Sequence, residues 1–414
     1  MKFFSLIIFL LLIADNPSER PYMGLTETPL LSTGEIFYRS LGKLVGVPNL
    51  KIFTVEIFVI FSFLLCRKEK TSEVYKGGTQ LLLCLLFLTL YGLINGGSLR
   101  FAALQIRPLI CLIFFCFLLQ STATKSTIHQ VENLIIASCI ARCVYGIYLW
   151  LLIFRNVDLF DHSMGDGSYV MSHSDSPLSV AAISIILVRA LRHRKYVKSS
   201  IFSISIILTF CILNNRRIFF VELSASLLIL FYLLNLKEKV TLKHKISGLI
   251  FSLTYSLWAW SSKSVLAYPI QTIKSSIMQS DASSKTRGVE NYNLIYTIRS
   301  RPVLGQGFGH KYIEKIQAFD ISHHFEAYEY VPHNSTLWVL TSGGLLFATF
   351  YYNFFSLSAK IKNHNDSSIA TIAIPILSAY FLHCFGDMGA QCWKTSVLVG
   401  TVLGCANAHT KDQQ

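Results

Sequence analysis

Two adjacent arginines stand between long apolar runs near the middle of the chain. Arg216 and Arg217 follow the apolar run 199–213 and open the apolar run 218–236. A guanidinium group binds two phosphate oxygens at once, so an arginine at the end of a membrane helix is suited to hold a lipid-linked diphosphate. The alternative is that both side chains extend to the phosphates of ordinary lipids. Arg216 and Arg217 are therefore candidate diphosphate ligands.

A histidine that could act as a general base stands at the start of a later apolar run. His333 and Asn334 follow Pro332 and open the apolar run 334–357. Asparagine is a favourable N-cap residue, and the free amides of a helix N-terminus attract anions. We expect this positive helix end to lower the pKa of His333, which favours the neutral imidazole that removes a proton. The alternative is that the two residues only cap the helix at the water interface.

Three glycines at alternate positions precede this histidine in the chain. Gly305, Gly307 and Gly309 follow the segment Arg301-Pro302. Glycine lets backbone amides approach a ligand or each other closely. No strand–helix context surrounds the three residues, so they do not form a dinucleotide-binding or phosphate-binding loop. They form either a tight turn or a ligand-contacting loop.

A metal or cofactor site is not indicated. His162, Asp166, His173 and Asp175 share one polar segment, but their spacing matches no defined metal site. All ten cysteines lie within or beside apolar runs, with no spacing typical of zinc ligands or disulfides. We expect no metal, no cofactor and no disulfide.

The elements that position these residues are long apolar helices. Hydrophobic residues make up 52% of the chain and charged residues 14%, against about 25% charged residues in soluble domains. Many apolar runs approach the ~20 residues that a helix needs to cross a bilayer. The sequence predicts an all-α, polytopic transmembrane bundle of about twelve spans. We place the spans near 3–14, 51–66, 79–96, 101–120, 132–154, 177–191, 199–213, 218–236, 246–262, 334–357, 367–385 and 389–407.

The placement of basic residues predicts the orientation of the bundle. The net charge of +14 is concentrated in short segments between apolar runs, namely Arg67–Lys76, Arg189–Lys198, Lys237–Lys245 and Lys360–Lys362. Such clusters are typical of cytoplasmic loops, and they need no nucleic-acid partner. If Lys2 is cytoplasmic, all four clusters are cytoplasmic and the acidic segment Asp158–Asp175 is outside. Both termini are then cytoplasmic. We expect the run 3–14 to remain as a first helix, because no small-x-small cleavage site follows it.

This orientation divides the chain into three parts. Residues 1–261 form spans one to nine, residues 262–333 form one long extracytoplasmic loop between spans nine and ten, and residues 334–414 form the last three spans and a cytoplasmic tail. Long loops in compact proteins are usually functional, and this one carries the glycines and leads directly to His333.

The order of these motifs resembles the O-antigen ligase / O-antigen polymerase superfamily of bacterial envelope enzymes. An arginine at the outer end of a mid-chain helix is followed by Arg287 ahead of a loop helix, by Pro302–Gly309, by His333-Asn334 and by Gly343-Gly344. The motifs extend from Arg216 to Gly344. The family commonly has a Ser-Arg pair where this chain has Asn215-Arg216-Arg217, so the resemblance leaves open which arginine corresponds.

The resemblance implies a metal-independent glycosyltransferase of the bacterial inner membrane with a periplasmic active site. Its donor is a glycan linked to undecaprenyl diphosphate, and its acceptor is a hydroxyl of another glycan or of a lipid. Membrane lipids and other envelope polysaccharide assembly proteins are further partners that it suggests. By position, it predicts catalytic roles for His333 and Arg287, diphosphate binding by Arg216, Arg217 and Arg301, and motif roles for Gly305, Gly307, Gly309 and Asn334.

Three functions follow from these expectations. A polysaccharide polymerase is favoured because the chain has little soluble mass to hold a large acceptor. A ligase acting on lipid A core is the first alternative. A flippase or transporter of lipid-linked sugar is the second, but transporters carry charged or broken segments in several spans. The spans of this chain are largely free of charged and helix-breaking residues, and Arg107-Pro108 and Glu222 are the main exceptions.

Overall fold

The computed structural model describes most of the chain. The described residues are 2–15, 29–38, 56–57, 72–153, 172–192, 197–214, 216–238, 242–262, 264, 267, 270–271, 274, 282–318, 327–360 and 368–408. Within these ranges the chain forms helices and turns without a strand, which confirms the all-α prediction. The α-helices are α1 (Lys2–Ile13), α2 (Pro29–Tyr38), α5 (Glu73–Ile94), α6 (Leu99–Thr122), α7 (Lys125–Ile153), α8 (Asp175–Arg192), α9 (Val197–Leu213), α10 (Arg217–Glu238), α11 (Leu242–Ser261), α13 (Ala282–Ser300), α14 (Ser335–Ala359), α15 (Ser368–Gly386) and α16 (Trp393–Ala406).

Several of these helices are built to lie in lipid. Five described helices are long and apolar enough to cross a membrane: α5, α6, α15, and most of α7 and α10. Helix α5 shows why, since Leu83, Leu86 and Leu90 share one face and are each more than half exposed. A bilayer is the solvent in which such an apolar outer face is stable. The chain is a membrane protein.

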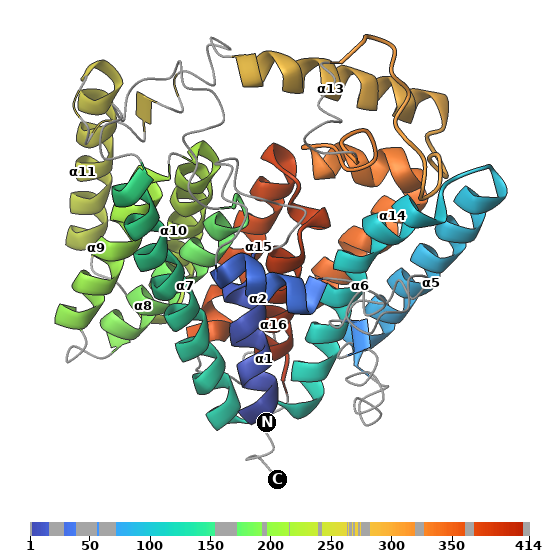
Figure 1. Cartoon of the computed structure of the whole chain (residues 1–414). Coiled ribbons are helices and arrows are strands. Elements are labelled where there is room, and N and C mark those ends of the chain that lie inside the picture. The colour runs from blue at the N-terminus through green and yellow to red at the C-terminus, as the bar shows by residue number, and fades with distance from the viewer. Residues whose placement is uncertain are drawn as a thin grey trace.

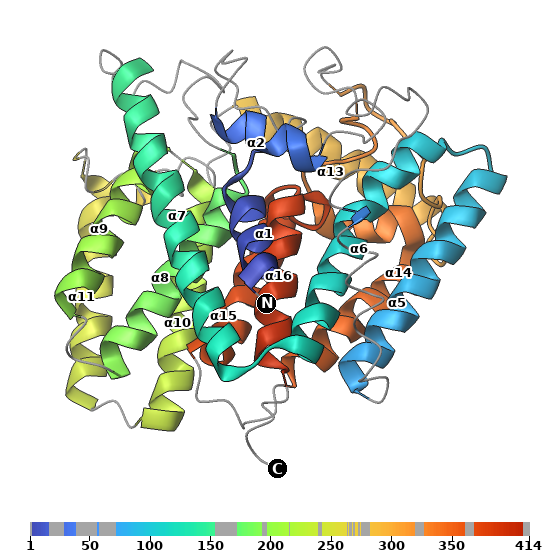
Figure 2. The ribbon, with the colours of Figure 1, turned by 60° about the horizontal axis from the view of Figure 1, so that its bottom comes forward.

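The helices stand side by side, and α13 lies across one end of the bundle (Figure 1). We name this end the α13 end. Helix α1 begins and α16 ends at the opposite end, where the two helices lie next to each other in the bundle (Figure 2). Successive helices alternate in direction, so the starts of α8, α10, α14 and α16 and the end of α15 all meet at the α13 end.

Eleven of the twelve expected spans coincide with described helices, and the expected span 51–66 lies outside the described residues apart from Glu56 and Ile57. Two expected spans differ in detail. The last is interrupted, because a short 3-10 turn at Gly389–Gln391 precedes α16 and Cys392 between them is extended. Helix α14 is kinked at Gly344, whose φ is 59°. The segment 262–333, which we expected to be an extracytoplasmic loop, contains α13, so Arg287 lies inside a helix and not ahead of one.

A buried ion network joins four segments at the α13 end of the core. Arg142 of α7 binds Asp175 of α8 (Nη2–Oδ2 2.7 Å) and Asp15 after α1 (Nη2–Oδ1 2.6 Å). Lys394 of α16 lies 3.1 Å from Asp175 and 3.6 Å from Asp15. Two cations and two carboxylates balance each other, as buried charges require. Arg142 and Lys394 are further charged residues within helices, and the expectation of nearly uncharged spans overlooked them.

Candidate functional site

Helix α13 directs one face at the bundle. Its residues Glu290, Asn293, Leu294 and Thr297 are all buried, and their spacing of three and four residues places them on the same side as Arg287. The polar members of this face fix the helix by hydrogen bonds. The Asn293 carboxamide oxygen accepts the amides of residues 315 and 316 at 3.0 and 2.9 Å, and the Thr297 hydroxyl accepts the amide of residue 313 at 2.8 Å. These hydrogen bonds therefore fix the position of α13 relative to the segment 313–316 that follows it.

Glu290 of this face binds His333. Its carboxylate accepts the backbone amide of His333 at 3.2 and 3.3 Å, and the ring atom Nδ1 lies 3.4 and 3.3 Å from the same oxygens. A carboxylate facing Nδ1 holds a proton there and leaves Nε2 as the accepting nitrogen. Glu290 is buried, while the His333 side chain is 30% exposed. This is the geometry of an oriented base.

The pKa of His333 is raised above its ordinary value. Burial of the imidazole lowers the pKa, but the hydrogen bond to Glu290 and the charge of Glu290 outweigh burial. The expectation of a lowered pKa at this helix N-terminus is therefore wrong. It considered only the helix end and not the carboxylate of a distant segment.

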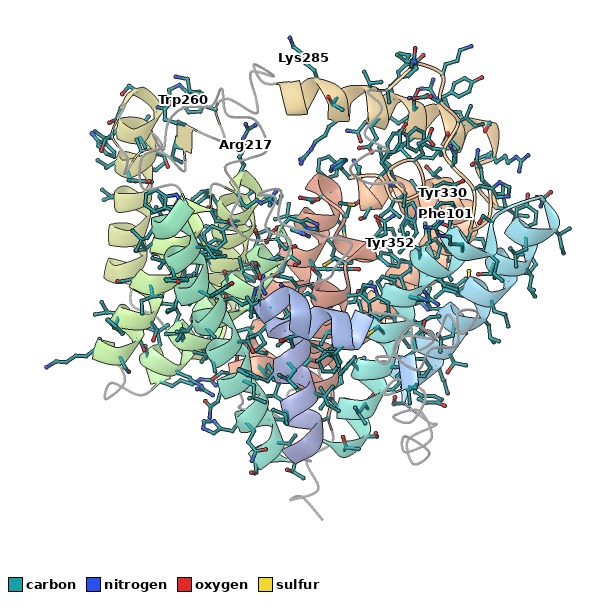
Figure 3. The ribbon with its side chains drawn as sticks, in the orientation of Figure 1. Phe101, Arg217, Trp260, Lys285, Tyr330 and Tyr352 are labelled. Carbon is teal, nitrogen blue, oxygen red and sulfur yellow. The ribbon has the colours of Figure 1, made fainter. Side chains whose placement is uncertain are left out.

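The segment before His333 is held from its other side by α6. The ring of Phe101 stacks on Tyr330 with centroids 3.7 Å apart and planes 11° apart (Figure 3). Gln105, one turn further along α6, donates to the carbonyl of Tyr330 at 2.7 Å. The backbone that leads into His333 is thus fixed between α6 and α13.

The first residues of α14 fix the other neighbours of His333. Asn334 is the N-cap residue, and its side chain accepts the amide of Leu337 at 3.0 Å. The Ser335 hydroxyl donates to the carbonyl of Asp387 at 3.2 Å. The start of α14 is therefore bound to the turn that follows α15.

That turn carries a buried carboxylate, Asp387, which sequence reasoning missed. Its side chain is 6% exposed. Burial raises the pKa of Asp387, but positive charge around it holds the pKa well below its usual range. The groups responsible are His173, Arg287, His383 and His333. Asp387 is therefore an anionic centre around which the cationic residues of the site gather.

Arg287 reaches this turn from α13. Its Nη1 donates to the carbonyl of Gly386 at 2.8 Å, beside Asp387. A Cβ built on Gly386 would lie 2.8 Å from Ile218 in the first turn of α10. The end of α15, the first turn of α10 and Arg287 of α13 therefore meet in one place.

The two candidate arginines at the start of α10 lie at this same end of the bundle. Arg216 precedes α10, and its charge acts on His383 near the end of α15. Arg217 is the first residue of α10 and lies at the α13 end of that helix (Figure 3). Both side chains are partly buried. The structure thus brings Arg216 and Arg217 to the end of the bundle that holds Arg287 and His333.

Arg301 is not brought to this place. It is exposed and follows the last residue of α13, whereas Arg287 lies in the second turn. At 1.5 Å per residue, the two positions are separated by roughly 20 Å along the helix axis. An arginine side chain does not span that distance.

The three glycines serve packing. Gly305, Gly307 and Gly309 have φ of 60°, 82° and 90°, which side chains with a Cβ rarely adopt. Their loop binds the kink of α14 and the α5–α6 hairpin. Gly307 donates to the carbonyl of residue 342 at 2.8 Å, and Gly309 donates to Gln105 at 2.7 Å. Because these amides are occupied within the protein, the geometry favours the tight-turn alternative over a ligand-contacting loop.

A buried chain of titratable side chains extends from Asp387 into the bundle. Oδ1 of Asp387 lies 3.9 Å from Nδ1 of His173, and this Nδ1 lies 3.4 Å from Nε2 of His383. Nδ1 of His383 lies 2.7 Å from Oε1 of Glu222 in α10. Sequence reasoning considered His173 only as a metal ligand and Glu222 only as an exception among the spans. No local spacing connects these residues, which come from α10, α15 and the turn before α8.

Neither a metal centre nor a disulfide is present among the described residues. No group of three or more His, Cys, Asp or Glu side chains there is placed to hold a metal ion. The described cysteines are free and buried. His162, Asp166, Cys66 and Asn215 lie outside the described residues.

No protein-family model matches this chain, and comparison with curated proteins finds no similar sequence. The relation to the O-antigen ligase / O-antigen polymerase superfamily therefore stays a prediction from the motifs.

Proposed function

We propose that this protein is a glycosyltransferase of the bacterial inner membrane that transfers a glycan from undecaprenyl diphosphate to an acceptor hydroxyl. The observation that carries the proposal is the pair of Glu290 and His333 beside Arg287 at the α13 end. A carboxylate-oriented imidazole next to a guanidinium supplies a proton acceptor and an anion ligand within one site.

His333 acts as the base. Glu290 holds a proton on Nδ1, so Nε2 accepts the proton of the acceptor hydroxyl as its oxygen attacks the anomeric carbon. The bond from that carbon to the diphosphate oxygen breaks, and the electron pair leaves with the diphosphate. The raised pKa of His333 makes it a stronger base than a free histidine.

Arg287 and the arginines of α10 stabilise the leaving diphosphate. Arg287 has five N–H donors, and the carbonyl of Gly386 occupies one of them at 2.8 Å. Arg216 and Arg217 lie at the same end of the bundle, from which they add positive charge. Preorganised charge of this kind is usually the largest contribution to such catalysis. Arg301 is too far along α13 to share the diphosphate with Arg287.

The distribution of basic residues supports a periplasmic site. The described members of the basic clusters lie at the end opposite α13, with Lys360 3.8 Å from Glu73 and Arg192 3.1 Å from Thr371. By the positive-inside rule that end is cytoplasmic. We therefore propose about twelve spans, with the run 51–66 as the second, both termini in the cytoplasm and α13 in the periplasm.

A polymerase is preferred to a ligase. Among the described residues, α13 and the short helix α2 lie across the bundle, and no separate domain is present there to hold lipid A core. Transport of lipid-linked sugar is the alternative from another class. The buried charges of Arg142 and Lys394 do not favour transport, because both are bound to carboxylates.

The test is a reconstitution with undecaprenyl-diphosphate-linked oligosaccharide in proteoliposomes. The protein should release undecaprenyl diphosphate and lengthen the glycan, and His333→Ala should lower the rate by about 10²–10⁴. His129→Ala is the matched control, because His129 also faces a glutamate, Glu132 at 3.7 Å, but at the opposite end. Glycan that crosses the membrane without release of the lipid diphosphate would identify a transporter instead.

A further inference from the structure

The side of α13 that is turned away from the bundle carries exposed basic and aromatic side chains. Lys285, Tyr292, Tyr296 and Arg299 follow one another at intervals of seven, four and three residues, which places them on one side of the helix. All four are exposed, and Lys285 points away from the bundle (Figure 3). Glu290 lies on the opposite side and is buried. We name the four exposed residues the outer face of α13.

The two tyrosine rings of the outer face are uncovered. Tyr292 is 50% exposed and Tyr296, one turn further along, is 38% exposed. Nζ of Lys315, in the segment after the three glycines, lies 5.7 Å from the centre of the Tyr296 ring. The face of an aromatic ring is apolar and carries negative charge, so it attracts the weakly positive C–H groups of a sugar ring as well as cations. Two such rings one helical turn apart can stack on the sugars of one glycan.

The charge around these rings is positive. Residues 282–318 contain six lysines and arginines but two glutamates, and one of the two is the buried Glu290. Lys285, Arg299 and Lys315 are exposed, and none of them forms an ion pair with a carboxylate in the described part of the chain. Cations that share one surface attract an anionic ligand. Charge complementarity therefore indicates an acidic partner.

We propose that the outer face of α13, together with Lys315, binds the acceptor glycan and that this glycan is acidic. Its sugar rings stack on the two tyrosines, and its carboxylates pair with Lys285, Arg299 and Lys315. This inference rests on the proposed function, which supplies a growing glycan as the acceptor. It deepens that function, because it names the chemical class of the acceptor and the surface that holds it outside the catalytic residues.

The position of the outer face suits the acceptor. Helix α13 lies across the end of the bundle where Glu290 binds His333, so a glycan that ends at His333 has to pass this helix. A helix with its side chains is about 10–12 Å across, so the sugars on the outer face belong to the same chain as the acceptor hydroxyl. The outer face is turned away from the bundle and hence from the bilayer, which does not favour a lipid headgroup. An acidic peptide would pair with the cations but give the exposed tyrosine rings no part.

The test measures the binding of oligogalacturonate, a chain of acidic sugars, to the full-length protein in nanodiscs of zwitterionic lipid. The neutral comparison is the methyl ester of the same oligosaccharide, which keeps the sugar rings without their charge. The acid should bind about tenfold more tightly than the ester at low salt, as expected for three exposed ion pairs, and the difference should shrink as salt screens them. Lys285→Gln, Arg299→Gln and Lys315→Gln combined should remove the preference for the acid.

The aromatic part of the outer face is tested separately. Tyr292→Ala combined with Tyr296→Ala should weaken the binding of acid and ester by the same factor, about tenfold, because stacking does not depend on the carboxylates. Both positions are exposed and alanine is a good helix former, so α13 should stay folded. Polyglutamate is the probe for an acidic peptide. If it binds as tightly as oligogalacturonate, the outer face binds any polyanion and the inference is overturned.

A combined Lys76→Gln, Lys198→Gln and Lys360→Gln variant is the control, because these exposed lysines lie at the opposite end and their loss changes the net charge equally. It should keep the preference for the acid, and an equal loss here would overturn the inference. A protein that transfers glycan in the reconstitution but does not prefer the acid keeps the proposed function and loses this inference. A protein that binds the acid as expected but releases no undecaprenyl diphosphate loses the proposed function instead.

Discussion

Glu290 of α13 binds both the backbone amide and the ring of His333, a residue 43 positions further along the chain. This contact joins the helix that lies across the bundle to the first turn of α14. It sets the height of α13 above the core and the orientation of the imidazole at the same time. Substitutions on α13 should therefore directly change the pKa of His333 and its activity as a base.

Glu290→Gln should shift the pH dependence of glycan transfer. The base must be unprotonated, so kcat/KM of the unaltered protein rises with pH through the raised pKa of His333. Without the carboxylate, burial and the charge of Arg287 lower that pKa, and the midpoint of the rise moves to lower pH. The plateau should also fall by about tenfold or more, because Nδ1 no longer holds its proton in place. A pH–rate profile measures both effects. Glu329→Gln, which removes a partner of Lys311 at the same end, should leave the midpoint unchanged.

Arg287→Ala should lower kcat by about 10²–10³, the usual cost of removing one preorganised donor from a developing charge. Arg287→Lys should restore little, because an ammonium group does not reproduce the bidentate fork. Arg301→Ala, at the far end of α13, should keep nearly full activity. Single-turnover kinetics on the three variants compares them directly. Equal losses for Arg287→Ala and Arg301→Ala would contradict the placement of the diphosphate.

Arg216 and Arg217 should differ in importance. Arg216 acts on His383 within the cluster, whereas Arg217 begins α10 itself. Arg216→Ala should therefore raise KM for the lipid-linked donor and lower kcat more than Arg217→Ala does. Titration of the donor in reconstituted vesicles gives both constants. Full activity in the double alanine variant would exclude the pair from the site.

The stability that the buried ion network gives the protein should depend on equal numbers of positive and negative charges within it. Asp15→Asn leaves Arg142 and Lys394 with the single carboxylate of Asp175, and breaking a buried pair in this way typically costs about 3–5 kcal/mol. The thermal denaturation midpoint in detergent should fall. Asp15→Asn combined with Lys394→Met restores equal numbers of charges and should recover part of the loss. A double variant no more stable than the single one would show that the charges are not coupled.

Gly307→Ala should destabilise the glycine loop. The residue has φ of 82°, and a Cβ there would lie 2.4 Å from Cα of Gly92. A strained φ of this kind costs about 1–3 kcal/mol, and the close contact adds to it. Gly288→Ala is the matched control, because a Cβ at Gly288 meets nothing within 4 Å and α13 gains a better helix former. Both are measured by thermal denaturation, and equal midpoints would contradict the packing role of the loop.

The amino-acid sequence by itself determined the helices, because their signals are local. Apolar runs long enough for a bilayer, the N-cap at Asn334 and the glycines at positive φ each depend on residues within a few positions. Basic residues between the runs predict which helix ends share a side. This is why His333, Arg216 and Arg217 could be predicted as candidates from the residues themselves, whereas Arg287 came from the family resemblance. All four are found at one end of the bundle.

Only the tertiary structure decided what these residues contact. His333 meets Glu290 from 43 residues away, His383 meets Glu222 across 161 residues, and His173 meets His383 across 210. No local periodicity encodes such pairs, since they depend on which helices become neighbours when the bundle packs. The raised pKa of His333 follows from one of these contacts, and so a prediction from its helix end alone had the wrong sign. Arg301 shows the converse. It is next to the motif Pro302–Gly309 in the sequence, but the length of α13 places it roughly 20 Å from Arg287 along the helix axis.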